Sequence, residues 1–302
     1  MKKFLYQTFF FCCILLTINF ILYFIGERLY TGNYKEYSLN FNSYLLSGSH
    51  GNALNDNTEE FGVYNFSDHS DSYIDMKRKL KFLIKHTHID TVYITVEDHT
   101  LSPYREYKNN LDRSKFYKIP SDYNYLFQYY IDKYVNNYLT LLSPKTGKVI
   151  KKYYFTKLKN STFFGKVNDS INIKKDFSKL SKEKKNERLL ARYNEQYTFT
   201  EKSILLKQTL LEIIAICKKN NIVLIGVKFP LSKEYLELIN GKSYGADKIF
   251  KKEGLLILDY KNEYISKTNY FLDEDHLNEK GGREFTKLLF AKDSSTYNLL
   301  FP

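Results

Sequence analysis

The residues of this chain whose types and spacing could carry out acyl chemistry lie in two short segments, near opposite ends of the sequence. The first, "SGSHG" at Ser47–Gly51, places a serine in a tight Gly/Ser turn after an apolar stretch. The second, "DEDHLN", places Asp273 three residues before His276. Nucleophilic acyl transfer needs a hydroxyl, a base within its reach, and a group that orients the base. Ser49, His276 and Asp273 could fill these three roles.

Each segment by itself is also typical of ordinary surface structure. A Gly/Ser turn after a strand is usually only a turn, and a D-x-x-H before a helix is usually a solvated helix start that Asp275 or Asn278 could cap. We therefore expect Glu274, Asp275 and Asn278 to have structural roles only. The catalytic interpretation depends on whether the fold brings the two segments together.

The elements that must position these segments alternate between strands and helices. Apolar and β-branched stretches predict strands within residues 37–51, 61–67, 91–99, 222–230 and 255–260. Helical periodicity predicts helices within residues 71–86, 201–221 and 277–293. This alternation predicts an α/β fold with three layers, in which a mostly parallel five-stranded sheet lies between helices.

In such a sheet, ligands bind at the carboxyl ends of the strands, and this edge predicts which further residues can join the site. Asn65 and Ser67 follow the second predicted strand, His99 follows the third, and His50 is next to the candidate nucleophile. We expect these residues to bind the substrate or its oxyanion, through the Ser67 N–H and the Asn65 or His99 side chains. Gly62 is an alternative donor in the second of these blocks.

In this order on this architecture, the two segments resemble the SGNH/GDSL hydrolase superfamily, whose nucleophile follows the first strand and whose D-x-x-H pair lies near the C-terminus. The resemblance covers residues 38–100 and 200–292 and implies an SGNH/flavodoxin-like fold. Two blocks depart from the family pattern: Ser47-Gly48 replaces the usual Gly-Asp, and "VEDH" replaces the usual G-x-N block. The H-L-N-x-x-G form of the last block resembles a membrane-anchored branch that includes the alginate O-acetylation and D-alanine transfer proteins.

The resemblance implies a bacterial serine esterase or O-acyltransferase that acts, most often with acetyl groups, on a cell-surface polysaccharide. It also implies a polytopic membrane O-acyltransferase as a partner that supplies the acyl group, and it implies no cofactor. The alternative is a non-catalytic protein of the cell envelope that binds glycan or assists assembly on the same fold.

A metal site is a further alternative that the residue types allow. His99, Asp98, His276 and Asp273 could supply ligands, but no H-x-H or H-E-x-x-H spacing supports them apart from the pair at residues 86 and 88. We therefore expect no metal.

The first 29 residues predict a transmembrane signal anchor. Lys2 and Lys3 precede an uncharged run of 23 residues, Phe4–Gly26. This run is long enough to span a bilayer and too long for a simple cleaved signal. The two lysines predict that the N-terminus stays in the cytoplasm, so that residues 30–302 form an extracytoplasmic α/β domain on a single-pass anchor. Within it, a basic, Tyr-rich insertion is predicted at about residues 102–200.

The charge of the chain is unevenly distributed. The net charge is +12, and residues 151–192 hold thirteen Lys or Arg against four acidic residues, a local net charge of +9. Such a run is usually a solvated surface, and the alternative is a surface for anionic headgroups or an acidic polymer. No nucleic-acid-binding motif accompanies it, so we expect no nucleic acid. The three cysteines show no CxxC spacing, which predicts neither a disulfide framework nor thiol chemistry.

Overall fold

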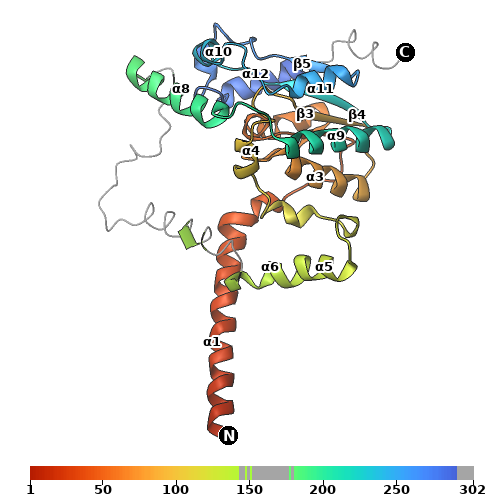
Figure 1. Ribbon diagram of the computed structural model, residues 1–302, viewed down its shortest axis with the longest axis vertical. Helices are drawn as coiled ribbons and strands as arrows, with labels where there is room; N and C mark the ends of the chain where they lie inside the picture. Colours follow the sequence, from red (N-terminus) through yellow and green to blue (C-terminus); the bar gives the residue numbers. More distant parts are fainter. Residues whose placement is uncertain (143–146, 148–149, 152–176, 178–179, 291–302) are drawn as a thin grey trace. The chain divides into compact units, whose positions relative to one another are not determined.

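The computed structural model describes residues 1–142, 147, 150–151, 177 and 180–290 (Figure 1). Much of the basic segment 151–192 lies outside the described residues. The chain divides into two compact units, one made of residues 1–37 and 111–173 and the other of residues 38–110 and 174–302. The predicted boundaries of the anchor and the insertion stay predictions.

The second unit is built on one five-stranded sheet in the order β2-β1-β3-β4-β5, with every neighbouring pair parallel. The predicted three-layer α/β class with a mostly parallel sheet is therefore confirmed. The strands are β1 (Ser43–Leu46), β2 (Val63–Asn65), β3 (Thr91–Thr95), β4 (Val223–Lys228) and β5 (Ile257–Asp259). They are shorter than the apolar stretches that predicted them, at both ends for β1 and β2.

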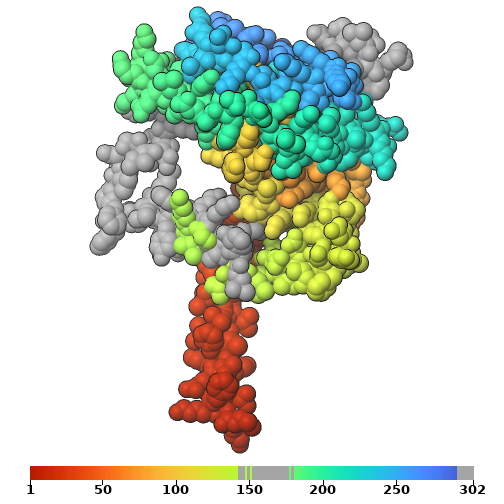
Figure 2. Space-filling model, in the orientation of Figure 1, coloured from red at the N-terminus to blue at the C-terminus, as the bar shows by residue number. Residues whose placement is uncertain are grey.

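Both faces of the sheet are covered, which explains the nearly continuous apolar sequence of β3 and β4. On one face Ile225 and Val227 pack with Phe285 and Leu289 of α12 (Glu279–Phe290). On the other face, Gly226 leaves room for the ring of Phe250. α11 (Ala246–Lys252), which carries Phe250, and α9 (Ile204–Lys219) cover this second face, and Figure 2 shows their side chains, teal to light blue, on the molecular surface.

The other helices of this unit are mostly short. The predicted helix 71–86 is α3 (Tyr73–His86), which Ser72 and Asp75 start with a capping box. The region 231–254 holds two helices, and the predicted insertion contributes α8, which belongs to the unit of the sheet. Within residues 38–110 and 180–290, the remaining helical segments are α2 (Ser49–Asn52), η3 (Asn55–Phe61), α4 (Tyr104–Tyr107), α8 (Lys182–Tyr197), α10 (Lys233–Ile239) and η10 (Thr268–Tyr270).

The first unit contains α1 (Lys2–Gly26), which continues into the π-helical turn η1 (Glu27–Thr31). Residues 2–31 form one helix that is long and apolar enough to cross a membrane, with a mean hydropathy of 2.4 in its most apolar window. A signal sequence near the N-terminus has the same properties. Among the described residues up to 142, this unit continues as a series of short helical turns: η2 (Asn33–Lys35), η4 (Ser114–Tyr117), η5 (Pro120–Asp122), α5 (Leu126–Tyr130), η6 (Ile131–Val135), α6 (Asn136–Tyr138) and η7 (Thr140–Leu142).

Candidate active site

The two sequence segments meet at the carboxyl edge of the sheet. Ser49 is the first residue of α2, directly after β1, and His276 lies in the loop before α12. The Oγ of Ser49 is 2.7 Å from Nε2 of His276. On the other side of the ring, Nδ1 of His276 is 2.7 Å from Oδ1 of Asp273. The structure thus brings together the hydroxyl, the imidazole and the carboxylate that the sequence singled out.

A second carboxylate, which the sequence reasoning assigned a structural role only, also reaches this imidazole. Oδ1 of Asp275 lies 2.9 Å from Nδ1 of His276. Asp275 does not cap α12; that role belongs to Asn278, whose Oδ1 accepts from the N–H of Gly281 at 2.9 Å. The expectation for Asn278 therefore fits the structure, and the expectation for Asp275 was wrong, because its side chain points into the site.

These contacts decide how the proton sits on His276. The Asp273 oxygen accepts the hydrogen of Nδ1 and the nearby charge of Asp275 favours it, so Nε2 has the lone pair that can accept the Ser49 proton. Burial alone would lower the pKa of His276, but the charge of Asp275 and the hydrogen bonds to Asp273 and Asp275 outweigh it and raise this pKa. The ring is thereby a stronger base than an ordinary histidine.

Asp275 stays ionised although it is buried. Burial would raise its pKa, but the Arg192 guanidinium and then His276 hold the pKa of Asp275 well below its usual range. Nε of Arg192 donates to Oδ2 of Asp275 at 2.7 Å, and the Gln196 amide donates to the same oxygen at 3.0 Å. The Tyr235 hydroxyl in turn donates to Oε1 of Gln196 at 2.8 Å. One turn of α8 therefore fixes the carboxylate.

His50, next to the candidate nucleophile, is a buried cation. Its Nδ1 donates to Oε1 of Glu97, and its Nε2 is 3.4 Å from Oδ2 of Asp275. Burial opposes protonation, but Glu97 and then Asp275 raise the pKa of His50 to about 10. Its charge lies between two buried carboxylates, so its main effect is to hold Glu97 and Asp275 in place.

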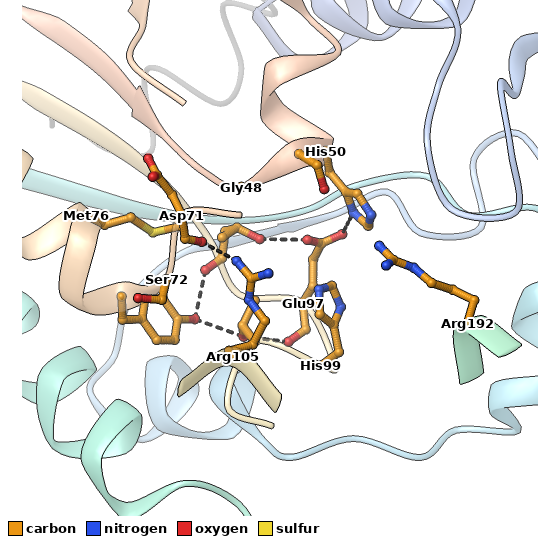
Figure 3. Close-up of a pocket in the computed structure, with 13 residues that line it drawn as sticks. Gly48, His50, Asp71, Ser72, Met76, Glu97, His99, Arg105 and Arg192 are labelled. Atoms are coloured by element: carbon orange, nitrogen blue, oxygen red, sulfur yellow. Dashed lines mark hydrogen bonds and ion pairs between the residues drawn. The ribbon is translucent and has the colours of Figure 1, made fainter. Parts of the chain in front are cut away.

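A small polar cavity opens beside Ser49 (Figure 3). Its lining comes from the ends of β1 and β3, the start of α3, and single arginines of α4 and α8. Figure 3 shows Arg192 reaching toward the paired His50 and Glu97, while Arg105 lies on the side of Asp71. The lining residues are Gly48, Ser49, His50, Asp71, Ser72, Tyr73, Met76, Thr95, Glu97, His99, Thr100, Arg105 and Arg192.

Two hydrogen-bond donors of this cavity could face a developing negative charge. Arg105 donates to the backbone oxygen of Asp71, and its guanidinium lies against Gly48, directly before the candidate nucleophile. His99 follows β3 as the sequence predicted. Burial lowers the pKa of His99 to about 3, so its ring is neutral and can donate one N–H without adding charge.

Asn65 and Ser67 lie at the end of β2, which pairs with the strand that precedes Ser49. Their polar groups already have hydrogen-bond partners in nearby backbone or side chains. The Asn65 amide donates at 2.9 Å to the carbonyl oxygens of both Gly51 and Asn55. The Ser67 N–H donates to Oδ1 of Asn65 at 3.2 Å. The alternative donor Gly62 ends η3 in a left-handed conformation. A role of Asn65 or Ser67 in oxyanion binding stays a prediction, and it would require these contacts to open.

Close backbone approaches hold the two halves of the site at a fixed separation. Gly282, in the first turn of α12, packs so tightly on Ala53 that a Cβ would overlap the Ala53 carbonyl oxygen. Gly51 lies equally close to the Ser47 side chain, because a Cβ there would be 2.5 Å from the Cβ of Ser47. The absence of a Cβ at Gly282 is therefore what lets α12 approach the segment that carries Ser49.

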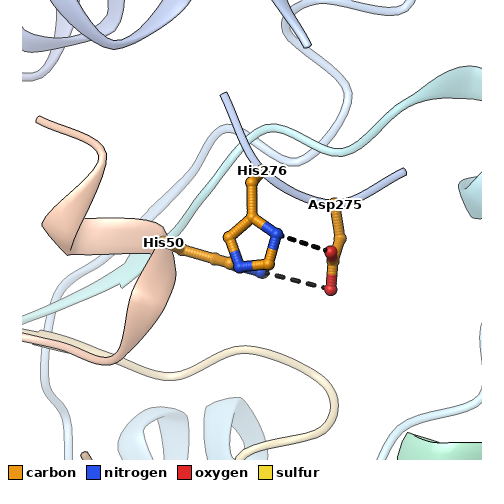
Figure 4. A group of neighbouring side chains, drawn as sticks. All are labelled: His50, Asp275 and His276. Carbon is orange, nitrogen blue, oxygen red and sulfur yellow. Dashed lines mark ion pairs between the residues drawn. The ribbon is translucent and has the colours of Figure 1, made fainter. Parts of the chain in front are cut away.

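Figure 4 shows His50, Asp275 and His276 together, a trio whose ligand atoms are close enough to hold a metal ion. The four residues weighed for this role from the sequence include Asp98, which instead pairs with Lys228 at 2.7 Å and with Lys261 at 3.1 Å. In the trio, Asp275 already binds Arg192, whose positive charge opposes a second cation. The arrangement is accounted for by ion pairs, and the expectation of no metal stays a prediction.

Sequence reasoning missed Asp275, Arg192 and Arg105. Asp275 carried a signal, because it is an acidic residue directly beside the candidate base. The two arginines carried none, since they lie in α8 and α4, which no motif connects to the site.

No protein-family model matches the chain, and no curated protein matches it. Among solved structures, a GDSL-like lipase from Bacteroides thetaiotaomicron is similar at 7% identity and a TM-score of 0.39, over 90% of this chain and 97% of the other. A proposed acylhydrolase from Bacteroides fragilis is similar at 9% identity and the same TM-score, over the same shares. Because the identities and TM-scores are low, the chemistry is argued from the side chains of the site alone.

Proposed function

We propose that this chain is a serine-dependent acyl-ester enzyme of the SGNH/GDSL type, a hydrolase or an acyltransferase. One observation carries the proposal: Ser49, His276 and Asp273 form a continuous chain of hydrogen bonds, with 2.7 Å on each side of the imidazole. This is the arrangement that makes a serine hydroxyl nucleophilic.

In the proposed reaction, Ser49 Oγ attacks the carbonyl carbon of the ester while His276 Nε2 takes the hydroxyl proton. Asp273 and Asp275 stabilise the imidazolium that forms. His276 then returns the proton to the alcohol that leaves, and an acyl-Ser49 ester remains. Water or a second hydroxyl attacks this ester in turn, which gives hydrolysis or transfer. The Ser49 N–H, His99 and Arg105 are the proposed donors to the oxyanion, and this electrostatic contribution is usually the largest single one.

The finer assignment is an O-acetyl group on a cell-surface polysaccharide, with a polytopic O-acyltransferase as partner. Its support is the H-L-N-x-x-G motif together with the apolar N-terminal helix, which would place the site beside the cell surface. The polar cavity supports a small acyl group rather than a long chain, because burial of a long chain requires an apolar lining.

The test uses the full chain purified in detergent, a fluorophosphonate probe and a small acetyl ester. Ser49→Ala is expected to abolish labelling and ester cleavage. Ser47→Ala is the matched control, since Ser47 lies in the same turn and its buried hydroxyl has no hydrogen-bond partner among the described residues; it should keep both. A well-folded wild-type chain that is neither labelled nor active would contradict the enzyme and favour a glycan-binding protein.

A further inference from the structure

The first unit exposes a band of mostly aromatic side chains that the proposed reaction does not use. The band lies in α5, η6 and α6, and its large side chains are between 49% and 72% exposed. Its members are Leu126, Phe127, Tyr130, Tyr134 and Tyr138. We propose that this band lies in the interface of a lipid bilayer, beside the point where α1 leaves the membrane.

The spacing of the band makes one continuous apolar face. Leu126, Tyr130, Tyr134 and Tyr138 follow each other at every fourth residue. Steps of four drift around an α-helix, which has about 3.6 residues per turn, and the wider π-helical turn η6 in the middle offsets this drift. The rings of Tyr130 and Tyr134 are stacked, with centroids 6.0 Å apart.

The opposite face of the same segment is polar and already satisfied within the unit. Asp132 accepts from the Tyr123 hydroxyl and from the Asn136 amide, each at 2.9 Å. Tyr129 is buried and receives a hydrogen bond from Lys133 at 2.8 Å. A segment with one exposed aromatic face and one satisfied polar face is typical of helices that lie along a membrane surface.

Hydrogen bonds fix the segment to α1 at a defined position along the helix axis, the level of Asn19. The Asn19 side chain donates to the Tyr138 carbonyl at 2.8 Å and accepts from the Leu141 N–H at 3.0 Å. The rings of Tyr23 and Tyr138 lie 5.1 Å apart, and Figure 1 shows α6 beside α1. These bonds explain how α1 holds an amide side chain within its apolar run.

That height corresponds to the membrane interface. A hydrocarbon core of about 30 Å takes about 20 helical residues, so a core that begins at Phe4 ends near Tyr23. Asn19 then lies roughly 6 Å inside the core edge, which is within the depth of about 5–10 Å reached by interfacial helices. Tyrosine, which makes up most of the band, is enriched at this level because its ring is apolar and its hydroxyl is polar.

The bilayer is favoured over a protein partner because the band is hydrogen-bonded to α1, the helix that is apolar enough to span the membrane. The inference rests on α1 being retained as a transmembrane helix, and it is independent of the proposed esterase chemistry. Since it concerns residues far from Ser49 in the sequence, a variant of the band tests it without changing the site.

The chain has no tryptophan, so a single introduced indole reports on its own surroundings without background. We would reconstitute the full chain with Phe127→Trp into vesicles whose lipids carry bromine either near the headgroup end or near the methyl end of the acyl chain. Leu16→Trp in α1 is the deep reference, and Tyr107→Trp, on an 80% exposed side chain of α4, is the aqueous reference.

Phe127→Trp is expected to lose emission mainly to the shallow bromine, Leu16→Trp mainly to the deep one, and Tyr107→Trp to neither. Tyr134→Trp should repeat the result for Phe127→Trp and guards against a local distortion. The proposal is overturned if both band variants behave like Tyr107→Trp, or if Leu16→Trp is unquenched. A blue-shifted but unquenched band would overturn it as well, and would assign this face to a protein partner or a second copy.

Discussion

At the scale of single residues, the three consecutive acidic residues Asp273, Glu274 and Asp275 have different contacts and different roles in the site. Asp273 accepts from both the backbone N–H and the Nδ1 of His276, at 2.8 and 2.7 Å, so it orients the ring and closes its own loop. Glu274 points away and pairs with Arg188 at 2.9 Å. Asp275 supplies the largest electrostatic contribution that raises the pKa of His276. Asp273 thus fixes the direction of the ring, while both carboxylates raise its pKa and Asp275 contributes the larger part through its charge.

The pH dependence of the reaction follows from this division. His276 must be neutral to accept a proton, so the rate of fluorophosphonate labelling should rise with pH through the pKa of His276. Because that pKa is raised, the midpoint should lie above the ordinary histidine value of about 6.5. A midpoint below the ordinary value would contradict the arrangement described for His276.

Asp275→Asn should move the midpoint of this rise in labelling rate to lower pH, because the substitution removes the charge that favours the imidazolium. Labelling at a single high pH should fall as well, since the remaining amide orients the ring less well. Glu274→Gln is the control and should leave the midpoint in place. If Asp275→Asn leaves the pH profile unchanged, Asp275 has no part in tuning the base.

At the scale of elements, the helices α8 and α12 hold the site together, although neither contains Ser49, His276 or Asp273. α8 brings Arg192 and Gln196 to Asp275, and α12 packs through Gly282 against the segment after Ser49. The carboxyl edge of the sheet supplies the other groups because parallel strands end at the same edge. The geometry of the site is therefore a property of how these elements pack.

Arg192→Leu should destabilise the fold, because it leaves the buried carboxylate of Asp275 without its strongest partner. Removal of one member of a buried ion pair typically costs about 3–5 kcal/mol of unfolding free energy. Denaturant unfolding of the variant measures the loss. Lys184→Leu, an exposed residue of the same helix, is the control. In the double variant with Asp275→Asn, much of the cost of Arg192→Leu should disappear, and strict additivity would argue against the pair.

Gly282→Ala should weaken both stability and activity, because its Cβ requires the space that the Ala53 carbonyl occupies. We expect a loss of about 1–3 kcal/mol of unfolding free energy, as is usual for overpacking. The Ser49–His276 separation should change with the shift of α12, which lowers the labelling rate several-fold. Arg283→Ala, on the exposed side of the same helix, should change neither quantity. An active, stable Gly282→Ala chain would show that this approach is not limiting.

At the scale of the whole molecule, the apolar N-terminal helix would determine where the proposed chemistry takes place. α1 combines a mean hydropathy of 2.4 with a window that is only 6% buried, so few of its side chains are covered by the described part of the chain. Such a surface requires a non-polar environment. Retention of α1 as an anchor with an extracytoplasmic enzyme stays a proposal.

Leu15→Arg together with Leu16→Arg should release the chain from the membrane fraction, because each arginine at the centre of a span costs about 2.5–3.5 kcal/mol of insertion free energy. The control is Ile204→Arg with Leu205→Arg, since these side chains of α9 are 83% and 51% exposed in the other unit. A C-terminal reporter that is active only outside the cytoplasm should be active in the wild-type chain. A cytoplasmic reading would contradict the proposed location.

The sequence by itself determined what depends on local patterns. Apolar and helical periodicity predicted the five strands, their parallel arrangement and the apolar N-terminal helix. A strand that is buried on both faces, or a helix that spans a membrane, requires an unbroken run of apolar residues, and such a run is visible in the sequence. The spacing of Asp273 and His276, with Ser49 after the first strand, likewise singled out residues that the sheet edge brings together. Only the tertiary structure decided that Asp275 shares the imidazole, that Arg192 fixes Asp275, and that the Asn65 amide is used on backbone carbonyls. These contacts join residues far apart in the sequence or depend on side-chain directions in irregular loops, where no periodicity exists to predict them.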